Sequence, residues 1–126
     1  MDIGKIINNG KFYDGYEDEP EIILSLSEKP EINIHIWEGY FADIFCKPVF
    51  NGKPWTGFTR DYQELKGMYD DDGTAVIDNI PEYLADILQY KDRKFTFDET
   101  KDVFELTIAL LLYASLNHCS VKTQLI

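Results

Sequence analysis

The sequence predicts an α+β fold, in which an antiparallel sheet of about four strands in the N-terminal half is packed by two or three helices. Two observations lead to this prediction. Residues 21–37 alternate apolar and polar side chains as strands do, whereas residues 80–117 carry apolar side chains at helical spacing. The 126 residues contain no internal repeat or linker-like stretch, so a single domain spanning residues 1–126 is expected.

The first half of the chain begins with a segment, residues 5–9, that fits either a short helix or a strand. An exposed acidic loop is expected next, at residues 14–21, because it contains Asp-Gly and is ended by Pro20. Residues 21–27 and 31–37 then read as two strands joined by a polar turn, which predicts an antiparallel hairpin.

The middle of the chain is harder to assign. Residues 40–50 are aromatic and favour a strand, although Pro48 interrupts them, and Asn51-Gly52 predicts a tight turn into a second strand at 55–59. Asp61 and Glu64 then have the spacing of a capping box, which indicates a short helix ended by residues 70–73. Residues 74–77 fit a brief strand.

The last third is expected to be helical. Asn79 and Glu82 have capping spacing and open an amphipathic helix over residues 81–90, and Thr96 and Glu99 open the last helix, at about 99–117. That last helix is apolar nearly all the way round, with Leu111 and Leu112 in one apolar stripe. It is too short to span a membrane, which needs roughly 20 apolar residues. It is therefore predicted to be buried in the core.

The net charge of −11 is the strongest compositional feature. Acidic residues are concentrated in two stretches, 14–21 and 61–86. A field of this sign repels nucleic acid and anionic membranes and attracts basic surfaces, so neither nucleic acid nor membrane is an expected partner. The N-terminal residues lack the pattern of a signal peptide, and two cysteines are too few for a disulfide framework, so a cytoplasmic location is expected.

No metal site or cofactor is expected. Aligning the run of aspartates at 70–72 and Gly73 with a calcium-binding EF-hand loop puts Met68 and Asn79 at the first and last ligand positions, where neither can serve. The sequence also lacks a glycine-rich phosphate loop. The side chains that could bind zinc are those of His35, Cys46, His118 and Cys119. None of them forms the close sequence pair that structural zinc sites usually show.

The segment WTGFTRDY at residues 55–62, followed by an acidic helix and turn, is similar to stretches of bacterial immunity proteins. These proteins accompany contact-dependent growth-inhibition and related polymorphic toxins. The resemblance implies a cytosolic protein that binds a cognate toxin domain, often a nuclease, and blocks it. The class spans many folds without shared catalytic residues, so it implies no enzymatic activity and no catalytic residue for this chain.

The functional hypothesis is an immunity protein that neutralises its toxin, a basic nuclease, by stoichiometric occlusion. Affinity in such interfaces needs desolvated aromatic anchors as well as charge. Two alternatives stay open: a small cytosolic enzyme that uses Cys46 and His35, and an acidic adaptor for another basic protein. The residues predicted to contact the partner are Trp55, Asp61, Tyr62, Glu64, Tyr69, Asp70, Asp71 and Asp72.

Overall fold

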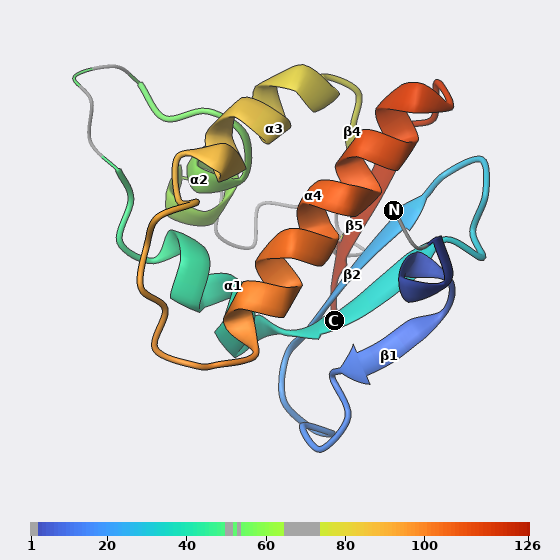
Figure 1. Ribbon diagram of the computed structural model, residues 1–126, viewed down its shortest axis with the longest axis horizontal. Helices are drawn as coiled ribbons and strands as arrows, with labels where there is room; N and C mark the ends of the chain where they lie inside the picture. The colour runs from blue at the N-terminus through green and yellow to red at the C-terminus, as the bar shows by residue number, and fades with distance from the viewer. Residues whose placement is uncertain (1–2, 50–51, 53, 65–73) are drawn as a thin grey trace.

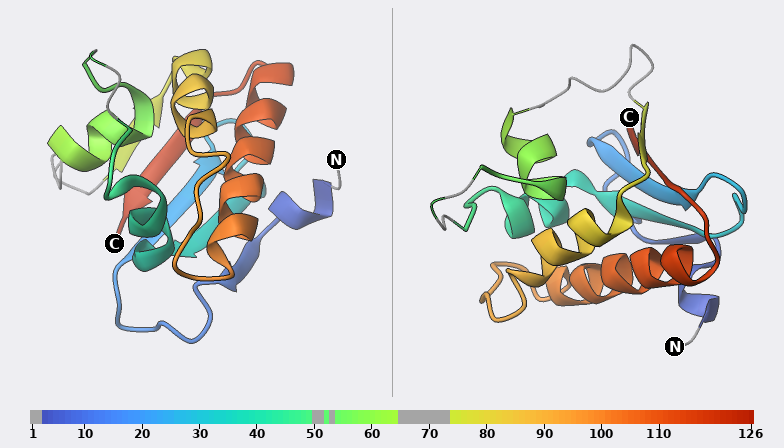
Figure 2. Two further views of the ribbon diagram at one scale, coloured as in Figure 1. Left: turned by 60° about the vertical axis from the view of Figure 1, so that its left-hand side comes forward. Right: turned by 90° about the horizontal axis from the view of Figure 1, so that it is seen from above.

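The computed structural model of the chain describes residues 3–49, 52, 54–64 and 74–126 (Figure 1). It confirms the predicted α+β class, with a five-stranded mixed sheet and helices packed on it. In the right-hand view of Figure 2, helices α3 (Ile80–Leu88) and α4 (Thr100–Leu116) run along the same side of the sheet. One hydrophobic core therefore lies between the sheet and the helices.

The predicted hairpin forms the centre of the sheet. Strand β2 (Glu21–Leu26) pairs antiparallel with β3 (Asn33–Trp37). The side chains alternate as predicted: Ile34 and Ile36 are fully buried in the core, whereas His35, which lies between them, points to the opposite face.

The sheet has five strands, in the order β1-β3-β2-β5-β4, rather than the expected four or so. Strand β4 (Thr74–Ile77) was predicted and lies at one edge, whereas β1 (Asn9–Phe12) lies at the other and runs parallel to β3. Strand β5 (Val121–Leu125), which was not predicted, inserts between β2 and β4 and is antiparallel to both. The C-terminal segment thus completes a sheet that was expected to come from the N-terminal half.

The expected hairpin between residues 40 and 59 is wrong, because this region forms helices α1 (Glu38–Phe45) and α2 (Gly57–Glu64). A short 3-10 helix, η1 (Ile3–Ile6), precedes β1. In α1 the large apolar side chains fall on one helical face, and burying that face outweighs the strand preference of aromatic residues. The buried side chains of α1 are those of Tyr40, Phe41, Ile44 and Phe45.

The predicted helix starts agree with the structure only in part. Asn79 caps α3 by accepting a hydrogen bond from the backbone N–H of Glu82, at 3.3 Å, which confirms the second capping pattern. The first pattern is wrong, because α2 begins at Gly57 and Asp61 therefore lies inside the helix. The N-terminus of α2 is instead capped from α3.

The third capping pattern, at Thr96 and Glu99, is also wrong. Glu99 stands at the N-cap of α4 without a side-chain capping bond. The segment is held by Asp43 of α1, whose carboxylate accepts hydrogen bonds from the backbone N–H groups of Thr96 and Phe97, both at 3.1 Å, and from the hydroxyl of Thr100 at 2.7 Å. A carboxylate far away in the sequence thus replaces the local cap.

We expect Asp43→Ala to lower the free energy of unfolding by about 2 kcal/mol at pH 7, because three charge-assisted bonds are lost at a partly solvated site. Burial raises the pKa of Asp43, but the bonds from Thr100, Phe97 and Thr96 together bring the pKa below its ordinary value of 3.8. Because the pKa of Asp43 is lower in the folded protein than in the unfolded chain, the ionised carboxylate stabilises the fold above about pH 4. This stabilisation is lost as the pH falls through the pKa of the folded protein.

The measurement is urea unfolding of wild type and Asp43→Ala between pH 3 and pH 7, with the exposed Asp92→Ala as a matched control. The difference between wild type and Asp43→Ala should shrink toward low pH. A constant difference across this range would contradict the role of the Asp43 carboxylate.

Helix α4 packs against the sheet as predicted, with Val103, Leu110 and Leu111 fully buried. It is not enclosed on all sides, however. The side chains of Leu112 and Leu116 are 46% and 78% exposed, so Leu112 does not belong to the buried stripe in which it was placed. Helices α1 and α3 and the 3-10 helix η1 also pack beside α4, and its remaining face, which carries Leu112 and Leu116, is exposed.

Candidate interaction surface

The predicted contact residues lie on and around α2, and the structure describes only part of them. Tyr69, Asp70, Asp71 and Asp72 lie outside the described residues, as does the turn expected at residues 70–73, where a calcium site was rejected. Glu64 is the last residue of α2. The positions that the structure places fully are therefore Trp55, Asp61 and Tyr62.

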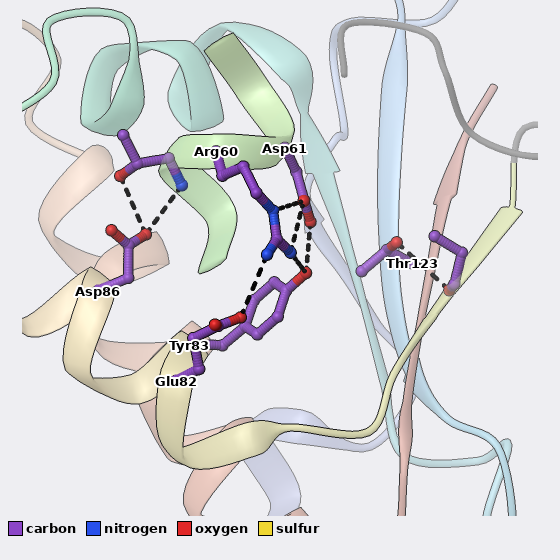
Figure 3. A network of polar contacts seen from close by, with 8 residues as sticks. Arg60, Asp61, Glu82, Tyr83, Asp86 and Thr123 are labelled. Atoms are coloured by element: carbon purple, nitrogen blue, oxygen red, sulfur yellow. Dashed lines mark hydrogen bonds and ion pairs between the residues drawn. The ribbon is translucent and has the colours of Figure 1, made fainter. Parts of the chain in front are cut away.

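Asp61 connects α2 to α3 (Figure 3). Its carboxylate accepts a hydrogen bond of 2.6 Å from the hydroxyl of Tyr83 and pairs with Arg60 at 3.2 Å. Arg60 also donates to the Tyr83 hydroxyl, at 3.1 Å, and lies 3.6 Å from Glu82. With its side chain 15% exposed and its oxygens bonded to Tyr83 and Arg60, Asp61 is a structural carboxylate, and its contact with a partner stays a prediction.

Asp86, a second acid of this stretch, is buried between the same helices, with 1% of its surface exposed. It accepts hydrogen bonds from the backbone N–H and the hydroxyl of Thr59, at 2.8 and 3.0 Å, and from the side-chain amide of Gln89 at 3.1 Å. Thr59 is in the first turn of α2, where backbone N–H groups have no partner within the helix. Asp86 therefore caps α2 from α3.

Burial raises the pKa of Asp86 above its ordinary value, although the bonds from Thr59 oppose this. The Thr59 hydroxyl donates to Asp86, so the hydroxyl of Tyr90, 2.7 Å away, donates to Thr59 in turn. Gly57 allows the close approach: its φ is +58°, and an added Cβ would lie 2.8 Å from Cβ of Asp86. The second acidic stretch thus contributes two carboxylates to helix packing.

Trp55 precedes α2 and Tyr62 lies within it, and both are half-buried. Burial, followed by the charges of Glu38 and Cys46, raises the pKa of Tyr62. The indole N–H of Trp55 is buried, and no hydrogen-bond partner is found for it in the described part of the chain. Both residues stay predicted contact residues, with part of their surface accessible.

Most carboxylates of the first acidic stretch are exposed, unlike Asp61 and Asp86 of the second. We call residues 14–19, between β1 and β2, the acidic loop; its carboxylate side chains are all exposed. The hydroxyl of Tyr13 holds the loop in shape by donating to the carbonyl of Glu19 at 2.6 Å. Burial and then the charges of nearby carboxylates raise the pKa of Tyr13. The carboxylates that act on it are Glu21, Asp18, Glu17 and Glu19.

Tyr16 of the acidic loop packs with three aromatic side chains from elsewhere in the chain, and we call the four the aromatic ledge: Tyr16, Trp37, Tyr40 and Phe97. The rings of Tyr16 and Trp37 are stacked, with centroids 4.2 Å apart and planes 6° apart. The ring of Tyr40 meets both of these rings edge-on. The hydroxyl oxygens of Tyr40 and Tyr16 are 3.2 Å apart. Phe97 closes the group and is 39% exposed.

In the sequence, Trp37 ends the strand predicted at 31–37 and Tyr40 begins the aromatic segment 40–50, and neither was connected to Tyr16 or Phe97. The four rings come from the acidic loop, from β3 and α1, and from the segment before α4. No spacing in the sequence links these places. The one feature of the sequence that could have pointed to this surface is that Tyr16 lies within the first acidic stretch.

The two residues of the enzyme alternative are on different sides of the sheet. The ring of His35 faces away from the helices, with Nδ1 2.7 Å from Oε2 of Glu21, whereas Cys46 follows α1 in the helical layer and is exposed. The structure therefore does not bring this pair together. Among the described residues, no group of three or more His, Cys, Asp or Glu side chains is arranged to hold a metal ion.

Comparison of the chain with family models, with curated proteins and with solved structures finds no match. A search of the described helices for one with the length and apolar character needed to cross a membrane finds none.

Proposed function

We propose that the chain is an immunity protein that binds a cognate toxin domain and neutralises it by stoichiometric occlusion. The observation that carries the proposal is the acidic loop, whose exposed carboxylates lie beside the partly exposed rings of the aromatic ledge. Interfaces gain affinity from aromatic anchors and gain association rate and specificity from complementary charge. The two kinds of side chain occur together at this surface.

A nuclease is the toxin that fits this surface best. A nuclease cleft binds a polyanion and must be basic, so a protein with a net charge of −11 can occupy it in place of the substrate. The same charge repels nucleic acid itself. The resemblance of residues 55–62 to immunity proteins supports the same class, and Trp55 and Tyr62 stay candidates for further contacts.

The test is coexpression of the chain in bacteria with the toxin domain encoded beside it, together with association kinetics of the two purified proteins. We expect the chain to restore growth and to form a one-to-one complex. The association rate constant should fall by about tenfold or more between low and physiological salt, because screening at a Debye length of about 8 Å removes long-range steering. Cells that die as fast as with toxin alone, without a complex, would contradict the proposal.

A further inference from the structure

The geometry of Tyr16 leaves one ring face for a ligand. Its inner face is stacked on Trp37, and the ring of Trp37 lies directly on Gly39, where an added Cβ would be 2.3 Å from the ring. Trp37 is thus covered on both faces. Tyr16 is half-buried: Trp37 stacks on one face of its ring, and Tyr40 meets it edge-on.

The orientation of this ring is fixed. The Tyr16 hydroxyl is paired with that of Tyr40, which is 5% exposed, and the backbone N–H of Tyr16 donates to the carbonyl of Tyr13 at 3.0 Å. A ring that is already immobilised loses little conformational entropy when a ligand stacks on it. The outer face of Tyr16 is thus preorganised for binding.

The charge around the ring specifies a cation. Glu17 and Asp18 follow Tyr16 directly and are exposed, and the charge of Glu99 reaches Tyr40 from the other side. A neighbouring cavity of about 410 Å³, which Phe97 also lines, carries basic and acidic side chains together: Lys91, Arg93, Lys94 and Lys101 with Asp92, Asp98 and Glu105. A positive group approaching this surface is therefore drawn to the acidic loop.

We propose that the outer face of Tyr16 and the carboxylates of the acidic loop form a docking site for an arginine side chain of a basic protein partner. A guanidinium can stack flat on the ring and still donate its N–H groups to carboxylates of the loop, of which Glu17 and Asp18 directly follow Tyr16. A lysine ammonium is a point charge and does not match both requirements with one geometry. The identity of the partner rests on the proposed function, whereas the chemistry of the site does not.

The stacking component is tested with two variants of Tyr16, using the toxin domain encoded beside the chain as the probe. Tyr16→Phe and Tyr16→Leu both lose the hydroxyl pair with Tyr40, so the difference between them reports the ring alone. We expect Tyr16→Phe to dissociate within about twofold of wild type, and Tyr16→Leu to dissociate at least tenfold faster. Circular dichroism and thermal unfolding confirm that both variants are folded.

The electrostatic component is tested with a neutralised loop, Glu17→Gln, Asp18→Asn and Glu19→Gln. These changes keep the loop geometry, because the amide oxygen introduced by Glu17→Gln can still accept from the N–H of Gly15, and asparagine tolerates the φ of +76° at position 18. The matched control removes the same charge at exposed positions elsewhere: Glu31→Gln, Asp92→Asn and Glu105→Gln. At low salt the loop variant should associate about tenfold more slowly than the control.

The preference for arginine is tested without the toxin. Hexa-arginine and hexa-lysine peptides are titrated against the chain in a Trp55→Phe background, in which Trp37 is the remaining tryptophan. We expect the arginine peptide to change the Trp37 fluorescence at a concentration at least threefold lower than the lysine peptide, and this difference to disappear in Tyr16→Leu.

The outcomes separate the two proposals. If the wild-type chain does not bind the toxin, the proposed function fails, while the peptide titration still decides on the arginine site. If the toxin binds but Tyr16→Leu and the neutralised loop behave like their controls, the arginine site is wrong and the proposed function stands. Equal binding of the two peptides would also overturn the arginine site.

Discussion

Leu111→Asp is expected to abolish cooperative folding. Leu111 lies in the middle of α4 with none of its surface exposed. A carboxylate at this position would be buried without a partner in place of a packed apolar side chain, which costs on the order of 4 kcal/mol or more. This is a large fraction of the 5–15 kcal/mol or so by which a domain of this size is stable.

The neighbouring residue provides the control for this prediction. Leu112 is 46% exposed, so Leu112→Asp should change the free energy of unfolding by less than about 1 kcal/mol. Near-UV circular dichroism and urea unfolding compare the two variants. A Leu111→Asp protein that unfolds cooperatively at the wild-type urea midpoint would show that α4 is not central to the core.

Asp86→Ala is expected to lower the free energy of unfolding by about 3 kcal/mol and to loosen α2. The variant leaves the N–H of Thr59 without its buried acceptor and opens a cavity between α2 and α3. Hydrogen exchange at the amide of Thr59 reports this site directly. We expect exchange there to become faster in Asp86→Ala than in wild type, by a larger factor than exchange in β2.

Asp86→Asn separates the hydrogen bonds from the charge. Its side-chain oxygen can still accept from Thr59, so we expect its stability at pH 7 to be within about 1 kcal/mol of wild type. The pKa of Asp86 is raised in the folded protein, so the folded state binds a proton more tightly than the unfolded state does. The contribution of Asp86 to stability therefore falls as the pH rises from 3.8 through the folded pKa, and the Asp86→Asn variant should not show this fall. A variant as unstable as Asp86→Ala would mean that the carboxylate charge is itself required.

The parts of the fold that could be predicted depend on contacts between residues close together in the sequence. The β2–β3 hairpin follows from alternation across one short turn, and the start of α3 follows from Asn79 and Glu82, three positions apart. The failures at α1 and α2 come from the same reliance on local signals. Aromatic residues favour strands on average, but here they bury one helical face against distant partners, Phe45 on Tyr90 among them.

The candidate site could also be predicted only in part from the sequence. Acidity, and with it the expectation of a basic partner, is a property of composition and can be read directly from the sequence. Which carboxylates are free to act on a partner cannot be read in this way. Asp61 and the exposed Asp18 look alike in the sequence, yet Asp61 is bound to Tyr83 and Arg60 of the same chain.

The sequence by itself therefore determined the fold class, the central hairpin, the α3 helix and the sign of the surface field. Only the tertiary structure decided that β5 enters the sheet, that Asp43 and Asp86 cap helices distant in the chain, and that Tyr16 stacks on Trp37. The physical reason is that periodicity and turn chemistry act over a few neighbouring residues. The burial of a ring and the partner of a carboxylate depend instead on which distant segments the folded chain brings into contact.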